Sequence, residues 1–163
     1  DVVTWHDQTI RRIVEAHSGI VVKTLGDGAM AAFESTRLGA RAALEIQRVI
    51  ATRPDQPNIR VRIGLHVGDV VQTGDDYLGQ AVNKTARIAS AASGGEIMVS
   101  TAVNALLAAD WLLVPCDMGT LSVEGVDDIF DTEQAGLDEH ETYLLLRGNA
   151  IRAYGLERFG IES

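Results

Sequence analysis

Residues 20–33 read IVVKTLGDGAMAAF, and this stretch decides the fold. The apolar run over residues 20–25, rich in β-branched side chains, is typical of a strand, and residues 29–33 return as a second apolar run. Between them lies Gly26-Asp27-Gly28, a sequence typical of a tight turn. The stretch therefore predicts a β-hairpin with an exposed carboxylate at its tip.

Helical patterns flank this hairpin on both sides. Ile10, Ile13 and Val14 recur at helical spacing, and Ser18-Gly19 is a usual stop signal for the helix that they predict, which extends to residue 17. An apolar stripe predicts a second helix over residues 37–51. The rest of the pattern predicts a strand at 61–65, its continuation at 70–71, a loop at 73–76, a helix at 81–92, a strand at 97–99, a helix at 101–109, and strands at 112–114 and 143–146.

Helices and hairpins mix here without the regular alternation of a doubly wound parallel sheet. The sequence therefore predicts an α+β fold, with a mostly antiparallel sheet and helices packed on one face. The length of 163 residues suits a single domain over residues 1–163. The pattern weakens after Asp117, and residues 127–163 are poorly assigned, with the strand at 143–146 the single element predicted there.

Composition excludes several classes of protein. The net charge of −9 argues against a nucleic-acid surface, which needs clustered Lys and Arg. No apolar run approaches the roughly 18 residues that would indicate a membrane helix. Cys116 is the single cysteine and cannot form an internal disulfide, so we predict a cytoplasmic location.

Three segments carry chemical signals: VKTLGDG at 22–28, within the hairpin, RIGLHVG at 62–68 and GQAVNKTARI at 79–88. In this order and spacing they resemble the class III adenylate/guanylate cyclase catalytic domain. The resemblance is strongest over residues 6–100 and decays beyond Gly125. It implies a ferredoxin-like, cyclase-type fold that lacks its usual first strand, because that strand is expected upstream of the helix that ends near residue 17.

Nucleotide cyclisation needs metal ions and positioned charge. The 3′-hydroxyl of a nucleoside triphosphate attacks the α-phosphorus and pyrophosphate leaves, so the protein mainly positions substrate and neutralises charge. Mg²⁺ or Mn²⁺ is the implied cofactor, and Asp27 is the implied metal ligand. The alternative for Asp27 is an aspartate favoured only by turn geometry.

Asn83 and Arg87 lie four residues apart, so both project from one face of the predicted helix at 81–92. The resemblance implies that Asn83 orients the ribose and that Arg87 stabilises charge on the transferring phosphorus. The alternative is a solvent-facing asparagine beside an arginine that forms a surface salt bridge.

Base choice rests on Lys23 and Asp76. Adenine offers a hydrogen-bond donor, its exocyclic amine, which a carboxylate matches. It also offers an acceptor, N1, which an ammonium matches. The resemblance places Lys23 and Asp76 at the positions where adenylyl forms have Lys and Asp, whereas many guanylyl forms have Glu and Cys. Asp75 takes this role if the loop shifts by one residue, and Lys23 is otherwise an exposed strand residue.

The resemblance also implies a homodimer with two composite sites that convert ATP to 3′,5′-cyclic AMP and pyrophosphate. One chain of each site supplies the metal carboxylate, and the other supplies the residues for base, ribose and phosphate. The histidines have no partners at metal-ligand spacing, and we predict a structural role for His66.

Two positions depart from the family's pattern. Asp1-Val2-Val3 faintly resembles the motif of the first metal-binding aspartate but lacks the small-residue turn that follows it. Glu124 stands where the family commonly has a lysine that contacts the triphosphate, and an anion there weakens binding of a polyanion.

The leading hypothesis is an enzyme, and the alternative, to which these departures point, is a non-catalytic cyclase-like module for dimerisation or nucleotide binding. A guanylyl cyclase is disfavoured by Lys23 and Asp76. A diguanylate cyclase would need an acidic signature on the hairpin, which the sequence lacks.

Overall fold

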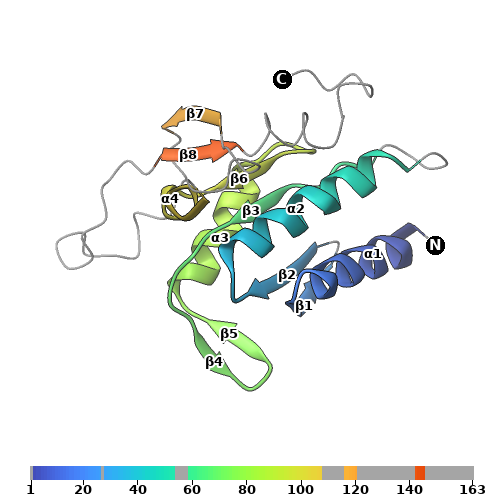
Figure 1. Ribbon diagram of the computed structural model, residues 1–163. Coiled ribbons are helices and arrows are strands. Elements are labelled where there is room, and N and C mark those ends of the chain that lie inside the picture. The colour runs from blue at the N-terminus through green and yellow to red at the C-terminus, as the bar shows by residue number, and fades with distance from the viewer. Residues whose placement is uncertain (1, 27, 54–58, 108–115, 121–141, 146–163) are drawn as a thin grey trace.

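The computed structural model describes residues 2–26, 28–53, 59–107, 116–120 and 142–145. Its helices are α1 (Val2–Ala16), α2 (Thr36–Ala51), α3 (Gln80–Ala91) and α4 (Thr101–Leu107) (Figure 1). Its strands are β1 (Gly19–Leu25), β2 (Gly28–Phe33), β3 (Ile63–Leu65), β4 (Val71–Thr73), β5 (Asp76–Leu78), β6 (Ile97–Val99), β7 (Cys116–Thr120) and β8 (Thr142–Leu145).

The described strands form three sheets. β1 and β2 make an antiparallel hairpin, β4 and β5 make a second one, and the third sheet has the order β3-β6-β8-β7. Every pair is antiparallel except β3 with β6, which run parallel. The predicted α+β class with mostly antiparallel pairing is therefore confirmed.

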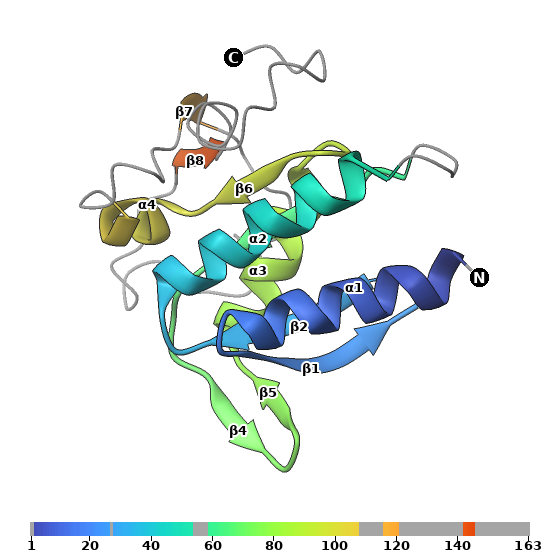
Figure 2. The same cartoon turned by 45° about the vertical axis from the view of Figure 1, so that its right-hand side comes forward.

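Helix α2 lies at the centre of the molecule and joins two parts of the core (Figure 2). On one side it packs with α1 and the β1–β2 hairpin, and on the other with β6 and α4. The first cluster contains Ile13, Val14, Ala42, Ile46 and Ile50, with Val21, Ala31 and Phe33 packed against it. The second contains Ala40, Ala43, Leu44, Ile97, Val99, Val103 and Leu107. Helices α1, α2 and α4 therefore share one side of the core, whereas α3 lies on the opposite face of β3 and β6, so the expectation that the helices pack on one face holds only in part.

Helix α3 packs on the opposite face of β3 and β6. Successive strand residues point to opposite faces, so Met98 faces away from Ile97 and Val99 and packs with Ile88 of α3. Gly64 of β3 also lies against α3, because a Cβ atom at Gly64 would stand 2.4 Å from the backbone nitrogen of Ala89. The helix that carries Asn83 and Arg87 is therefore seated directly on the backbone of β3.

The structure refines several predicted boundaries. Helix α1 begins at Val2, and its end is marked by Ser18, which adopts a left-handed conformation with φ of 58°. The loop predicted at 73–76 is the turn of the β4–β5 hairpin, and β5 was not predicted. Strand β8 confirms the strand predicted at 143–146, whereas β7 was not predicted. The strand predicted at 112–114 lies outside the described residues.

Substituting Gly64 with alanine is expected to destabilise the fold. The new methyl group would meet backbone atoms of α3, including the Thr85 carbonyl oxygen at 2.8 Å, which cannot move aside as a flexible side chain could. Overpacking of this kind costs roughly 1–3 kcal/mol of unfolding free energy. Thermal unfolding would measure the loss, and Ala86→Gln, on the exposed surface of the same helix, is the control expected to stay within about 0.5 kcal/mol. A Gly64→Ala protein as stable as the parent would contradict the packing.

Candidate active site

A β-bulge in β1 determines where Lys23 points. Val21 pairs with Ala31, but Lys23 pairs with Met30, so β1 has one extra residue between these two pairs. Cross-strand partners share a face of the sheet. Val21 and Ala31 face the core under α1 and α2. Met30 neighbours Ala31, so Met30 and Lys23 lie on the opposite face. Regular alternation would have directed Lys23 into the core, and the bulge prevents this.

The β4–β5 hairpin brings Asp76 to the same side as Lys23. Thr73 pairs with Asp76 across a two-residue turn, and Asp76 is the first residue of β5. Gly79 then connects β5 to α3 with φ of 141° and ψ of 174°, a backbone conformation that favours glycine. This sharp connection places Asp76 only a few residues ahead of the first turn of α3.

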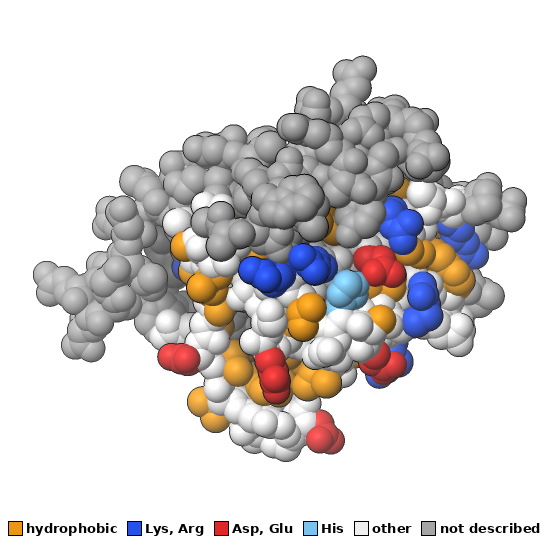
Figure 3. All heavy atoms as spheres, viewed as in Figure 1, with side chains coloured by type: hydrophobic (Ala, Val, Ile, Leu, Met, Phe, Trp, Pro, Cys, Tyr) orange, Lys and Arg blue, Asp and Glu red, His pale blue; other side chains and the backbone are white. Residues whose placement is uncertain are grey.

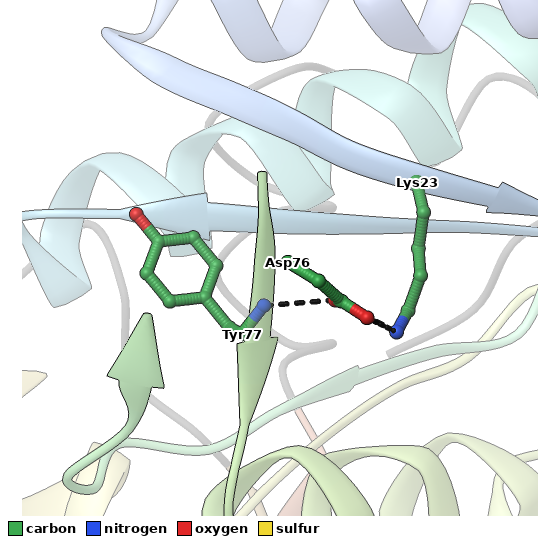
Figure 4. Close-up of polar contacts among 3 residues, drawn as sticks. All are labelled: Lys23, Asp76 and Tyr77. Carbon is green, nitrogen blue, oxygen red and sulfur yellow. Dashed lines mark hydrogen bonds and ion pairs between the residues drawn. The ribbon is translucent and has the colours of Figure 1, made fainter. Parts of the chain in front are cut away.

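Lys23 and Asp76 form a bidentate ion pair across 53 residues of sequence (Figure 4). The Lys23 Nζ donates to Asp76 Oδ1 at 2.8 Å and to Oδ2 at 2.7 Å. The backbone N–H of Tyr77 also donates to Oδ1, at 2.8 Å, while the Tyr77 ring points away from the pair. The two side chains are 34% and 42% exposed, so a ligand can reach them. Asp75, the alternative partner, is an exposed residue of the turn.

Asp76 is held in its charged form by these contacts. The hydrogen bond from Lys23 is the largest cause that lowers the pKa of the Asp76 carboxyl below its ordinary value, and the Tyr77 N–H adds to the effect. A donor that bonds the carboxylate favours the ionised state. At neutral pH the site therefore presents a negative carboxylate and a positive ammonium side by side.

The ion pair should contribute to stability only above the acidic range. Because the pKa of Asp76 is lower in the folded chain than in the unfolded chain, its contribution is present above the ordinary aspartate pKa of about 4 and disappears as pH falls through the folded-state value. We expect the parent to have a higher melting temperature than Asp76→Asn at pH 7 and the difference to shrink as pH falls below the ordinary aspartate pKa of about 4. Thermal unfolding of both proteins across this range would measure it, and a difference independent of pH would contradict the assignment.

Asn83 and Arg87 both lie on α3, as predicted. They are one helical turn apart, and Asn83 is exposed while Arg87 is half-buried. Helix α3 has no side-chain cap at Gly79, and its first turn follows directly from the strand that carries Asp76. The chain therefore presents Asp76 and the two helix residues from consecutive elements, β5 and α3, whereas Lys23 comes from β1.

Several other predicted positions fall outside the described residues, namely Asp27, Asp1, Glu124 and His140. Among the residues that the structure does describe, no three His, Cys, Asp or Glu side chains gather as a metal site. None of the described helices combines the length and apolarity needed to cross a bilayer.

Sequence reasoning missed two polar contacts. The Tyr77 backbone N–H fixes Asp76, and a backbone donor leaves no signal in side-chain patterns. Ser100 bonds His66, with 2.8 Å between Ser100 Oγ and His66 Nδ1. Ser100 stands directly after the strand predicted at 97–99 and before the helix predicted at 101–109, and a serine at that position is a usual cap of a helix N-terminus.

Comparison with known proteins gives the class. The family model for the adenylate and guanylate cyclase catalytic domain matches residues 1–147. An uncharacterized protein of Mycobacterium tuberculosis is 36% identical over 126 residues, which cover 74% of this chain and 42% of that protein. A crystal structure of an adenylate/guanylate cyclase/hydrolase from Silicibacter pomeroyi is 27% identical, with a TM-score of 0.71, and the match covers 87% of this chain and 80% of that one.

Adenylate cyclases from Trypanosoma brucei, solved in their monomeric state, share the fold with a TM-score of 0.75 at 22% identity over 91% of this chain and 79% of theirs. The chain therefore belongs to the adenylate and guanylate cyclase catalytic domain family. It spans less than half the length of the curated relatives that it matches. Cyclases of this family generally use divalent metal ions, and their domains bind nucleotides and typically work as dimers.

Proposed function

We propose that this domain converts ATP to 3′,5′-cyclic AMP and pyrophosphate at a site shared between two copies of the chain. The observation that carries the proposal is the Lys23–Asp76 pair, which the fold assembles from β1 and β5 at the positions expected to read the base. We also propose that residues 1–163 act as one catalytic-type domain, and a cytoplasmic location remains a prediction.

The Lys23–Asp76 pair retains one unused hydrogen-bond donor and one unused acceptor, which are the two groups that adenine needs. Lys23 uses two of its three N–H donors on Asp76, so one donor remains for adenine N1. Asp76 Oδ1 already accepts from Lys23 and Tyr77, whereas Oδ2 accepts once and has a lone pair for the 6-amino group. The pair need not open for adenine to bind, and Tyr77 fixes which carboxylate oxygen is available.

The remaining steps fall to α3 and to the hairpin tip. Asn83 would hold the ribose so that its 3′-hydroxyl faces the α-phosphorus. As the new O–P bond forms, the bond to pyrophosphate breaks and the hydroxyl proton passes to solvent water. Arg87, planar and permanently charged, suits the charge that spreads over the phosphoryl oxygens. Asp27 would hold Mg²⁺ or Mn²⁺, which are oxygen-seeking ions, and the metal would neutralise charge on the phosphates.

An apolar surface beside the base-reading pair supports a homodimer. Val71 and Leu78 are cross-strand partners and are 67% and 52% exposed. They alternate with Gln72 and Tyr77, so they lie on the same face of the hairpin as Asp76. Hydrophobic side chains gather over the lower part of the surface in Figure 3, where Figure 1 places β4 and β5. Exposed apolar patches mark association sites, and this one adjoins the proposed substrate site.

The decisive experiment offers ATP and GTP separately to the purified protein, with Mg²⁺ or Mn²⁺, and measures the cyclic product. Cyclic AMP formed from ATP and abolished by Asp27→Asn would support the proposal. Cyclic GMP as the main product would contradict the base assignment. A protein that binds ATP and forms neither product under any of these conditions would favour the non-catalytic nucleotide-binding module.

A further inference from the structure

His66 and Ser100 meet at the ends of two parallel strands. β3 and β6 run parallel, with Leu65 opposite Val99, so their carboxyl ends lie at the same edge of the sheet. The next residue on each strand is polar, His66 after β3 and Ser100 after β6. The ladder continues through the Ser100 N–H, which donates to the Leu65 carbonyl at 3.1 Å. His66 Nδ1 then lies 2.8 Å from Ser100 Oγ.

Ser100 is fully buried and caps α4. Its Oγ accepts from the Val103 N–H at 3.4 Å, and its carbonyl accepts from the Asn104 N–H at 3.0 Å. The same Oγ is hydrogen-bonded to His66 Nδ1, and the tautomer of the imidazole sets which of the two donates. The imidazole is therefore held in place by a buried, rigid partner.

The other ring nitrogen, Nε2, lies near Gly68, and Gly68 lies close to the first turn of α3. A Cβ atom at Gly68 would stand 3.5 Å from His66 Nε2 and 2.9 Å from the Ala81 side chain. His66 thus borders the place where the segment after β3 touches the first turn of α3. At the other end of that helix, Gly64 allows the backbone at Ala89 to sit against β3. The same strand and the residues after it contact α3 at both ends.

We infer that His66, held by Ser100, is a positioning residue that sets the first turn of α3 and thereby places Asn83 and Arg87 against the nucleotide. The inference rests on the proposed function, because it concerns how those two side chains reach the substrate. A displacement of about 1 Å in a positioning element can reduce turnover roughly a hundredfold. A residue that contacts no substrate can therefore control kcat through the helix it orients.

Two variants separate positioning from general stabilisation. His66→Asn keeps a polar atom near the place of Nδ1, and so keeps the Ser100 contact, but lacks the part of the ring that reaches Gly68. His66→Gln extends a polar atom toward the place of Nε2 but loses the Ser100 contact. We expect His66→Asn to melt close to the parent while its kcat falls about tenfold to a hundredfold with little change in KM. We expect His66→Gln to melt lower and to keep more of its kcat.

A merely structural histidine would give the reverse order, with activity following melting temperature, and that outcome would overturn the inference. Hydrogen exchange supplies a readout that needs no turnover. In His66→Asn, amides of residues 80–88 should exchange faster than in the parent, while amides of α4 stay unchanged. Unchanged exchange at residues 80–88 would also overturn the inference. If the parent forms no cyclic nucleotide, the proposed function fails, and the exchange data alone decide whether His66 positions α3.

Discussion

Replacing Arg87 with alanine is expected to lower kcat by about 10²–10³ while the KM for ATP changes little. The guanidinium would act on charge that develops as the α-phosphorus is attacked, so its loss raises the barrier more than it weakens substrate binding. Arg87 lies on α3, one turn after Asn83, on a helix seated against Gly64. Steady-state kinetics with ATP would measure both constants.

Arg87→Lys is the matched control. It keeps the positive charge but loses the planar, forked donor, so we expect a kcat between those of the parent and Arg87→Ala. Mixing provides a second control. If the site is shared, inactive Arg87→Ala and inactive Asp27→Asn chains should together recover about a quarter of the parent activity, since half of the dimers are mixed and each has one intact site. No recovery on mixing would place both residues in one chain's site and contradict the shared arrangement.

Exchanging the two partners of the ion pair should invert the base preference. In the double variant Lys23→Asp with Asp76→Lys, the donor and the acceptor trade places while the opposite charges remain adjacent. Adenine carries its donor at position 6 and its acceptor at N1, whereas guanine carries an acceptor at position 6 and a donor at N1. The ammonium at position 76 would then suit guanine O6. We expect the kcat/KM ratio of GTP to ATP to rise roughly a hundredfold or more.

Total activity of the double variant should fall, because the Tyr77 N–H loses its carboxylate acceptor, so the ratio of the two nucleotides is the informative measurement. The single variant Lys23→Asp is the control: it sets two carboxylates face to face and should lose activity with both nucleotides. Melting temperatures should be lower for the single variant than for the double one. A double variant that still prefers ATP would show that this pair does not read the base.

The sequence predicted the local elements well where side-chain pattern and turn chemistry agree. The hairpin around Gly26-Asp27-Gly28 and the helix carrying Asn83 and Arg87 both appear in the structure. β5 was missed because its three residues are too few for a periodic signal, and two of them, Asp76 and Tyr77, are not aliphatic. β7 contains Asp117 and Gly119, residue types that are depleted in strands, and so gave no signal either.

The candidate site was harder to predict from residues alone. Nothing in local pattern joins Lys23 to Asp76 across 53 positions, and only the family resemblance suggested that they act together. The contact depends on the extra residue in β1 and on the exact connection at Gly79, neither of which periodicity reveals. The roles of these residues in catalysis stay predictions, whereas the ion pair itself is a feature of the fold.

The extra residue in β1 has a consequence for engineering this domain. Deleting Val22 would remove the bulge, and Lys23 would then directly follow Val21, still opposite Met30 on the outward face. Losing the bulge with Val22 retained would have the opposite effect, because Lys23 would then share the inward side with Val21 and its ammonium would be driven toward the layer beneath α1. The reach of Lys23 to Asp76 therefore depends on the register of β1 against β2, which a change in length can preserve and a change in pairing can destroy.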